Sequence, residues 1–227
     1  MNISIVIPIF NEQNNINFLL NEIFNLEIKN FEVIIVDDNS TDNSIKNLSL
    51  SNHYKKIKII QNRNNKGQSF SIHRGIENSS FTNIVTIDGD CQNNPKDILK
   101  ISKIYFSDNE IKLVGGIRKN RKDSLNKIFA SKIANFVRRI YLDDKCADTG
   151  CSLKIFDKDI FLNFPYFDGI HRFLPALFRG YGYKTSFIDV DHRLRKAGYS
   201  KYNNINRFFR GIKDMLKVKK IIQKKEK

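Results

Sequence analysis

Short runs of Ile and Val recur along the first half of the chain, separated by segments in which apolar residues fall at helical spacing. Short β-branched runs are typical of strands that are buried on both faces of a parallel sheet. We expect strands at Ser4–Ile9, Phe31–Val36, Ile57–Ile60 and Ile84–Ile87, and helices at about Asn15–Ile28, Thr41–Leu50 and Gln68–Asn78. Strands that alternate with helices in this way predict an open α/β sheet.

The second half has a less regular pattern. Pro95 is expected at the start of a helix, with Asn94 as its cap. Gly115-Gly116 ends an expected strand and opens a basic loop, IRKNRKDS. The further expected elements are helices at about Lys96–Phe106, Leu125–Ile140 and Gly169–Gly180, and strands at Lys112–Gly115, Cys151–Phe156 and Thr185–Val190. With no internal repeat or linker, we expect one α/β domain at residues 1–202, followed by a C-terminal helix at 203–227.

Polar clusters follow three of the expected strands. PIFNE comes after the first strand, VDDNST after the second and DGDCQ after the fourth. Ligands of open α/β sheets bind outside the carboxyl ends of the strands. The three clusters therefore predict a nucleotide site at that edge of the sheet.

The stretch VTIDGDCQNNPKDI places two carboxylates, Asp88 and Asp90, at the end of a buried strand. Gly89 permits the tight turn between them, and Gln92 adds an amide oxygen. Oxygen ligands of this kind suit Mg²⁺ or Mn²⁺, which bind one or two carboxylates together with substrate phosphates. A solvated turn with a capping Asp is the alternative for an isolated pair. In a strongly basic chain, a metal that bridges to a diphosphate is the better interpretation.

The other two clusters leave alternatives open. Asp37 and Asp38 either bind a nucleobase or ribose, or one of them caps the next helix. PIFNEQNN places Pro8 at the end of a strand and Glu12 in the loop that follows. NKGQS contributes Gly67, whose turn before a helix suits close packing of backbone against a nucleotide.

The charge balance points to an anionic partner. The chain has 39 Lys and Arg against 24 Asp and Glu, a formal net charge of +15. Nucleic acid, an anionic membrane or phosphorylated substrates each fit this balance. The three cysteines form no CxxC pair, which favours a reducing cytoplasm over a disulfide framework or a zinc site. The apolar runs are too short for a transmembrane helix, and the N-terminus is expected to be a strand, not a signal peptide.

Taken in order, the motifs resemble those of the family 2 glycosyltransferases of GT-A fold. The resemblance is to the dolichol-phosphate mannosyltransferase-like branch, which makes polyprenyl-phosphate sugars. The matching stretches are SIVIPIFNEQNNI, VIIVDDNSTDNS, NKGQSFSIHRGI, VTIDGDCQNNPKDI, DTGCSLKIFDKDI and RKAGYSKY. They extend from about residue 3 to residue 202, and they imply a mostly parallel open sheet flanked by helices.

The resemblance also implies a role for each matching residue. Three positions depart from the family pattern: Lys127 and Lys154 where Arg is usual, and Ser152 where Gly is usual. The implied nucleotide-sugar ligands are Pro8, Glu12, Asp37, Asp38, Gly67, Asp88, Arg195, Ser200 and Lys201, and the implied metal ligands are Asp88, Asp90 and Gln92. The residues implied on the catalytic and acceptor side are Asp90, Arg118, Lys127 and Ser131, and Asp148 heads the stretch DTGCSLKIF.

The activity implied is metal-dependent, inverting transfer of one sugar from a GDP- or UDP-sugar to a lipid phosphate such as a polyprenyl phosphate. A lipid phosphate is already anionic and needs no general base, whereas a hydroxyl acceptor does. The chain has no Trp and so lacks the QxxRW motif of processive synthases. A transferase acting on the hydroxyl of a glycolipid or saccharide is the alternative. A nucleic-acid-binding protein is the remote one, because it leaves the acidic clusters unexplained.

The C-terminal segment combines apolar and basic positions. Residues 203–227 contain nine Lys and Arg against two acidic residues, a net of +7. Apolar residues recur at helical spacing at Ile205, Phe208, Phe209, Ile212 and Leu216. A basic amphipathic helix is typical of an interfacial membrane element. We therefore expect a peripheral protein on the cytoplasmic face of a membrane; the alternative is a helix packed on the core with a solvated basic face.

Overall fold

A computed structural model of the chain describes residues 1–119, 135–194 and 204–225. The described residues form a seven-stranded sheet in the order β3-β2-β1-β4-β6-β5-β7. Its strands are β1 (Asn2–Ile9), β2 (Asn30–Asp37), β3 (Ile57–Gln61), β4 (Asn83–Thr86), β5 (Ile111–Lys119), β6 (Lys154–Asp157) and β7 (Lys184–Asp191). Neighbouring strands are parallel except at β6, which runs antiparallel to both β4 and β5. The expected mostly parallel α/β sheet is confirmed.

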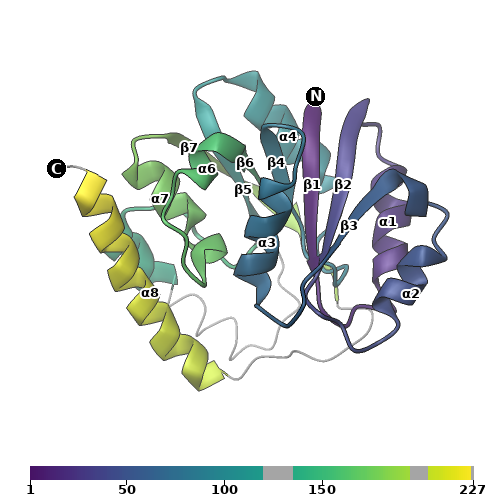
Figure 1. Cartoon of the computed structure of the whole chain (residues 1–227). Coiled ribbons are helices and arrows are strands. Elements are labelled where there is room, and N and C mark those ends of the chain that lie inside the picture. The colour runs from purple at the N-terminus through teal and green to yellow at the C-terminus, as the bar shows by residue number, and fades with distance from the viewer. Residues whose placement is uncertain (120–134, 195–203, 226–227) are drawn as a thin grey trace.

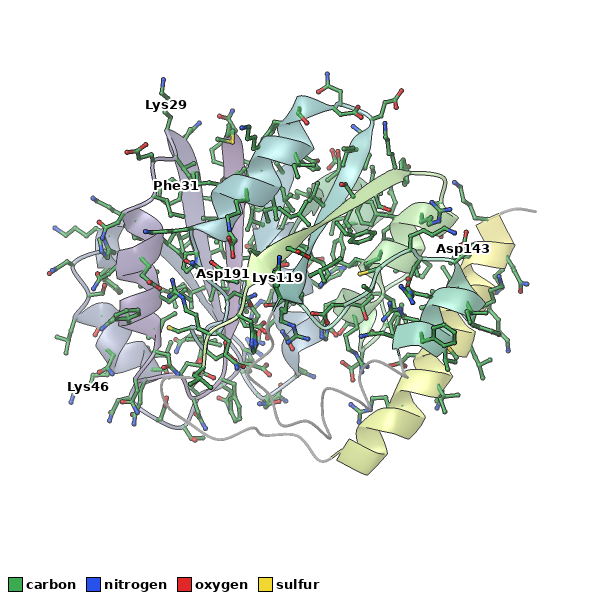
Figure 2. All side chains as sticks on the ribbon, turned by 180° about the vertical axis from the view of Figure 1, so that it is seen from behind. Lys29, Phe31, Lys46, Lys119, Asp143 and Asp191 are labelled. Carbon is green, nitrogen blue, oxygen red and sulfur yellow. The ribbon has the colours of Figure 1, made fainter. Side chains whose placement is uncertain are left out.

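Helices cover both faces of this sheet. Figure 1 shows α3, α6, α7 and α8 in front of the sheet with α4 behind it, and Figure 2 shows α1 and α4 from that other side. The helices are α1 (Ile16–Phe24), α2 (Ser44–Ser49), α3 (Gln68–Glu77), α4 (Asp97–Ser107), α6 (Lys158–Leu162), α7 (Leu174–Gly180) and α8 (Asn204–Lys225), with single 3₁₀ turns at Tyr54–Lys56 and Ile170–Arg172. Residues 135–142 are also helical.

Alternate side chains of each strand enter two separate cores, because successive residues of a strand point to opposite faces. On β1, Ile5 and Ile7 pack under α1 and α4, whereas Val6 packs under α3 and α7. On β6, Ile155 and Phe156 divide in the same way. This burial on both faces explains the continuous Ile and Val runs in the sequence.

The direction of the strands brings the sequence motifs to one edge. β1, β2, β4 and β5 all end at this edge, and antiparallel β6 begins there. The register places Ile9 beside Asp37, and Lys154 beside both Thr86 and Gly115. Segments distant in the sequence therefore meet where ligands of open α/β sheets bind.

Several expected boundaries differ from the structure. β5 does not end at Gly115-Gly116 but continues to Lys119, because it pairs along its whole length with β7, up to Lys119 beside Asp191 (Figure 2). Arg118 is therefore a strand residue, not a loop residue. α4 begins at Asp97 and not at Lys96, and the Asn94 side chain accepts from the amide of Lys96 without capping the helix.

Further corrections concern elements on the second half of the chain. The single helix expected at Gly169–Gly180 is a 3₁₀ turn followed by α7, with Pro175 in the first turn of α7. α6 was not expected; Asp157 caps it by accepting from the amides of Asp159 and Ile160. Within the helix expected at Leu125–Ile140, the described part is helical from 135 and extends to 142.

The C-terminal helix α8 packs against α7. Val218 and Ile222 are buried in the core cluster that also contains Leu177 and Phe178 of α7. Gly180 permits this approach, since a Cβ there would lie 2.5 Å from the Ile222 side chain. Arg172 and Asp214 form an ion pair at 2.8 Å. Among the described helices, none is both long and apolar enough to cross a membrane.

Candidate active site

The loops after β1, β2 and β4 interlock at the site edge. The backbone amide of Asn11 donates to Ser40 Oγ at 2.8 Å, and the amide of Thr41 donates to Asn11 Oδ1 at 2.7 Å. A Cβ on Gly89 would lie 2.7 Å from Ile9 Cγ2, so only glycine lets the DGD turn pack against the end of β1. Loops that are distant along the chain thus contact one another at this edge.

Asp38 anchors the loop before α3. Its carboxylate accepts from the backbone amides of Lys66 at 2.8 Å and Gly67 at 2.7 Å, and from the Asn62 side chain at 2.8 Å. Gly67 has φ +88°, a conformation that favours glycine. The side chain of Asp38 does not cap α2, so the capping alternative is wrong for this residue. Its neighbour Asp37 accepts from the amide of Ser40.

Asp88 and Asp90 form a pair of carboxylates at the end of β4. Burial, together with the negative charge of Asp90, raises the pKa of Asp88 from 3.8 to about 6. Gln68 Nε2 donates to Asp88 Oδ1 at 2.7 Å, and the Asp88 amide donates to Ser152 Oγ at 3.2 Å. Asp90 is 7% exposed and accepts from the amide of Gln92 at 3.1 Å. Two nearby carboxylates repel each other when both are ionised, and a bound cation offsets this repulsion.

The donor set fits a hard divalent ion that is shared with a substrate. The two carboxylates and the Gln92 amide offer oxygen ligands of the kind that Mg²⁺ and Mn²⁺ prefer. The described residues hold no cluster of three or more His, Cys, Asp or Glu placed to hold a metal ion. Such a site leaves the remaining coordination to phosphates and water, which is usual for Mg²⁺ beside nucleotides.

Arg118 lies close enough to Asp88 to act on its charge, and Asp148 holds it in place. Its Nε donates to Asp148 Oδ2 at 2.7 Å, and its Nη2 donates to Oδ1 at 2.9 Å. The Arg118 amide also donates to Oδ2 at 3.3 Å. Gly150 lies directly beneath the guanidinium, where a Cβ would be 2.9 Å from Nη2. A bidentate pair of this kind fixes the plane of the guanidinium, and the charge of Arg118 counteracts the rise in the pKa of Asp88.

Lys154 is a buried lysine beside the loop that carries Asp148. Its ammonium donates to the carbonyl oxygens of Cys151 and Thr149, the latter at 3.4 Å. Burial lowers its pKa, although the nearby acidic groups, Asp148 and Asp88 among them, counteract this. Lys154 therefore stabilises the turn that carries Asp148, and its ammonium opposes the rise in the pKa of Asp88.

Sequence reasoning missed several residues that shape the site. Gln68 lies within the NKGQS motif and Asn62 lies just before it, and each supports an acidic residue as described above. Ser152, a departure from the family pattern, accepts from the Asp88 amide and donates to Asn93 Oδ1 at 2.8 Å. Hydroxyl and amide side chains in loops are too common to stand out without the structure.

The structure brings together most of the residues that the motifs indicated. The residues gathered at this edge are Pro8, Glu12, Asp37, Asp38, Gly67, Asp88, Asp90, Gln92, Arg118 and Asp148. The carboxylate of Glu12 accepts from the Asn15 side chain at 2.7 Å. Lys127, Ser131, Arg195, Ser200 and Lys201 lie outside the described residues, so their roles stay predictions.

A family model for glycosyl transferase family 2 matches residues 4–163. The chain belongs to glycosyl transferase family 2. The match covers β1 to α6 and every described motif residue, and it confirms the family that the motifs resemble.

The names of two curated relatives include a polyprenyl phosphate. The chain is 34% identical to a dodecaprenyl-phosphate galacturonate synthase of Rhizobium johnstonii, over 96% of this chain and 66% of that protein. It is 32% identical to an undecaprenyl-phosphate 4-deoxy-4-formamido-L-arabinose transferase of Pectobacterium carotovorum, over 89% and 63%. The chain thus spans slightly less than two thirds of the length of these relatives.

Solved structures share the fold. Glucosyl-3-phosphoglycerate synthase of Mycobacterium tuberculosis, in complex with Mn²⁺, UDP and glucosyl-3-phosphoglycerate, superposes with a TM-score of 0.72 at 13% identity. The likeness covers 96% of this chain and 78% of that one. At this identity the likeness concerns the fold alone, and it confirms the expected GT-A architecture.

Proposed function

We propose that this family 2 member transfers a single sugar from a nucleotide-sugar to a polyprenyl phosphate, with inversion and in the presence of Mg²⁺ or Mn²⁺. The observation that carries the proposal is that a carboxylate pair and a fixed arginine lie at the same sheet edge. Asp88 and Asp90 offer ligands for a cation on the nucleotide side, and Arg118 offers a fixed positive charge beside them. The names of the curated relatives favour this acceptor class.

The nucleotide side is built from the loops after β1, β2 and β4. The loop held by Asp38, including Gly67, gives the base and ribose a backbone surface. Asp88 and Asp90 face the diphosphate, where a bound divalent cation would neutralise the charge that develops on the leaving group. Gln68 and Ser152 keep Asp88 in place, so the carboxylates are oriented before the donor binds.

On the acceptor side, Arg118 orients the lipid phosphate. The phosphate oxygen itself attacks the anomeric carbon as the nucleoside diphosphate leaves on the opposite face, which gives inversion. Because the phosphate is ionised at neutral pH, the chain needs no general base at this position. Asp148 fixes the Arg118 guanidinium and limits its freedom, which favours a single orientation of the acceptor.

The test is a matrix of donors and acceptors. UDP- and GDP-sugars are incubated with and without Mg²⁺ or Mn²⁺, in the presence of polyprenyl phosphate or of soluble and glycolipid hydroxyl acceptors. We expect product with polyprenyl phosphate and a divalent cation, and none with EDTA or with Asp90→Asn. Transfer to a hydroxyl acceptor alone would replace the proposed acceptor, and turnover in EDTA would refute the metal dependence.

We further propose that the protein works at the cytoplasmic face of an anionic membrane. α8 presents two faces: Val218 and Ile222 pack inward, whereas Ile212 and Leu216 are 39% and 47% exposed. Lys213 and the exposed lysines of the last turns lie around the outward apolar face. One face of α8 packs on the core, and the proposed membrane contact would use the other face.

A second outward apolar face lies on helix 135–142. Phe136, Val137, Ile140 and Tyr141 are exposed, Ile140 by 69%. Leu142, at the end of this helix, shares a core cluster with Val218 and Ile222 of α8. Two basic helices that share one core and expose apolar side chains suit a bilayer interface.

Co-sedimentation with anionic vesicles tests this surface. Removing α8 is not a clean perturbation, because it uncovers the core cluster that Val218 and Ile222 close. The double variant Ile212→Ser/Leu216→Ser leaves that core intact, and we expect it to reduce the bound fraction at low salt. Lys46→Ser, on exposed α2 at the far side of the molecule (Figure 2), is the control. Equal sedimentation of all three proteins would contradict the membrane role.

A further inference from the structure

A buried arginine organises the segment that leads to Asp148. Arg138 lies on helix 135–142 and is 6% exposed, and its partner Asp144 is fully buried. Its Nε donates to Asp144 Oδ2 at 2.5 Å, and its Nη1 donates to Thr149 Oγ1 at 2.6 Å. The guanidinium also donates to the carbonyl oxygen of Cys146 and to the Asn135 side chain. One side chain thus ties a helix to several points of the loop that follows it.

This loop is held at both ends. Arg138 contacts it at Asp144, Cys146 and Thr149, and Lys154 contacts it at the carbonyls of Thr149 and Cys151. Asp148 lies between these anchors. Moving Thr149 moves its neighbour Asp148, and with it the carboxylate that sets the Arg118 guanidinium.

The helix that carries Arg138 has two opposite faces. At 100° per residue, Arg138 and Leu142 lie on one side, and both are buried. Phe136, Val137 and Ile140 lie on the other side and are exposed. The outer face is therefore exposed, while Arg138 on the inner face ties the same helix to the loop.

We propose that Arg138 is a positioning residue that couples the outer face of helix 135–142 to the orientation of Arg118. This inference rests on the proposed function, in which Arg118 orients an anionic acceptor. It adds that the acceptor side is aligned from the lipid-facing surface, while the nucleotide side, built on β1, β2 and β4, makes none of these contacts.

The geometry requires arginine and not simply a buried cation. The guanidinium forms a planar fork whose donors reach a carboxylate, a hydroxyl, a carbonyl and an amide oxygen simultaneously. Lysine keeps the charge but offers one nitrogen in place of three. A buried ion pair by itself is weak support for a purely stabilising role, and neither Arg138 nor Asp144 contacts the nucleotide-side residues in the described structure.

Steady-state kinetics with polyprenyl phosphate in anionic vesicles test the proposal. We expect Arg138→Lys and Thr149→Val each to lower kcat/KM for the lipid acceptor by roughly tenfold or more, as expected for lost buried hydrogen bonds. The KM for the nucleotide-sugar, and its metal-dependent hydrolysis without acceptor, should stay within about twofold. Arg139→Lys, at the exposed neighbouring position, should match the wild type in both.

The stimulation of activity by vesicles is the readout that a merely structural residue would not change. Wild type and Arg139→Lys should respond to vesicles, whereas Arg138→Lys and Thr149→Val should respond less at equal folded fraction. Equal losses for donor and acceptor that follow the thermal midpoint would overturn the coupling. If Arg138→Lys does not fold, Thr149→Val decides alone. A wild type without polyprenyl-phosphate activity refutes the proposed function, whereas an active wild type with unaffected variants refutes this inference alone.

Discussion

The carboxylate pair Asp88 and Asp90 predicts that cation binding depends on pH in a defined window. Burial and the charge of Asp90 hold the pKa of Asp88 near 6, against an ordinary value of 3.8. A protonated Asp88 is a poor ligand, so Mn²⁺ or Mg²⁺ has to displace a proton when the pH lies below about 6. We expect the cation to stabilise the fold strongly above this pH and weakly below it.

The size of the effect follows from the shift. Between about pH 7.5 and pH 5, a group with pKa near 6 goes from almost fully ionised to about nine-tenths protonated, which weakens apparent affinity by roughly tenfold, or about 1.4 kcal/mol. Without metal, the stability of the fold changes with pH in the opposite direction. A raised carboxyl pKa means that the folded state takes up a proton between about pH 4 and 6, so stability falls across that window as pH rises, by about 3 kcal/mol.

Thermal unfolding followed over a Mn²⁺ titration at about pH 5 and about pH 7.5 measures both trends. Asp90→Asn is the informative variant, because it removes a ligand charge and also the like charge that raises the pKa of Asp88. Asp90→Asn should lower the affinity for the cation by at least the roughly 10- to 100-fold that loss of an outer-shell partner costs. Its residual affinity should also vary less with pH.

Two outcomes would refute this reasoning. Equal Mn²⁺ stabilisation at the two pH values would mean that Asp88 does not titrate in this window. Full stabilisation of Asp90→Asn would mean that Asp90 is not a ligand. Asp42→Asn, in the loop before α2, is a matched control, since its carboxylate accepts from Ser44 and Gln13 and lies outside the carboxylate pair.

Three further predictions separate the two sides of the site. Arg118→Ala should raise the acceptor KM or lower kcat by more than it weakens nucleotide binding measured by calorimetry; the reverse result would place Arg118 on the donor side. Asp38→Asn weakens two charge-assisted bonds to backbone amides and should cost about 1–3 kcal/mol in nucleotide affinity, and unchanged affinity would remove the loop from the nucleotide surface. Gly89→Ala places a Cβ 2.7 Å from a β1 side chain; overpacking should cost about 1–3 kcal/mol and reduce metal-dependent turnover, whereas Gly211→Ala, which meets open space, should do neither.

The parallel half of the sheet was predictable because its strands are buried on both faces and therefore read as uninterrupted Ile and Val runs. The acidic clusters were predictable for a related reason: a carboxylate directly after a buried strand has to lie at the strand's end. Asp38 and Asp88 both follow this rule.

The acceptor side was harder to predict. Arg118 was expected in a loop, since Gly115-Gly116 looked like a strand end, and only pairing with β7 keeps the chain extended to Lys119. The insertion of β6 between β4 and β5 depends on long-range contacts that local pattern does not encode. Arg138 is one of several basic residues in a segment expected to be helical, and its burial follows from the path of the loop beyond it.

Strand β6, which runs antiparallel to both of its neighbours, also bears on how the chain is made. During synthesis, β1 to β4 emerge first and can pair as β3-β2-β1-β4, but one edge of β4 stays open until Lys154–Asp157 have been added. An unpaired, apolar strand edge is a template for association between chains. The nascent protein therefore passes through an interval of exposure that ends only when β6 docks, and substitutions that delay this docking should lower soluble yield without altering the finished enzyme.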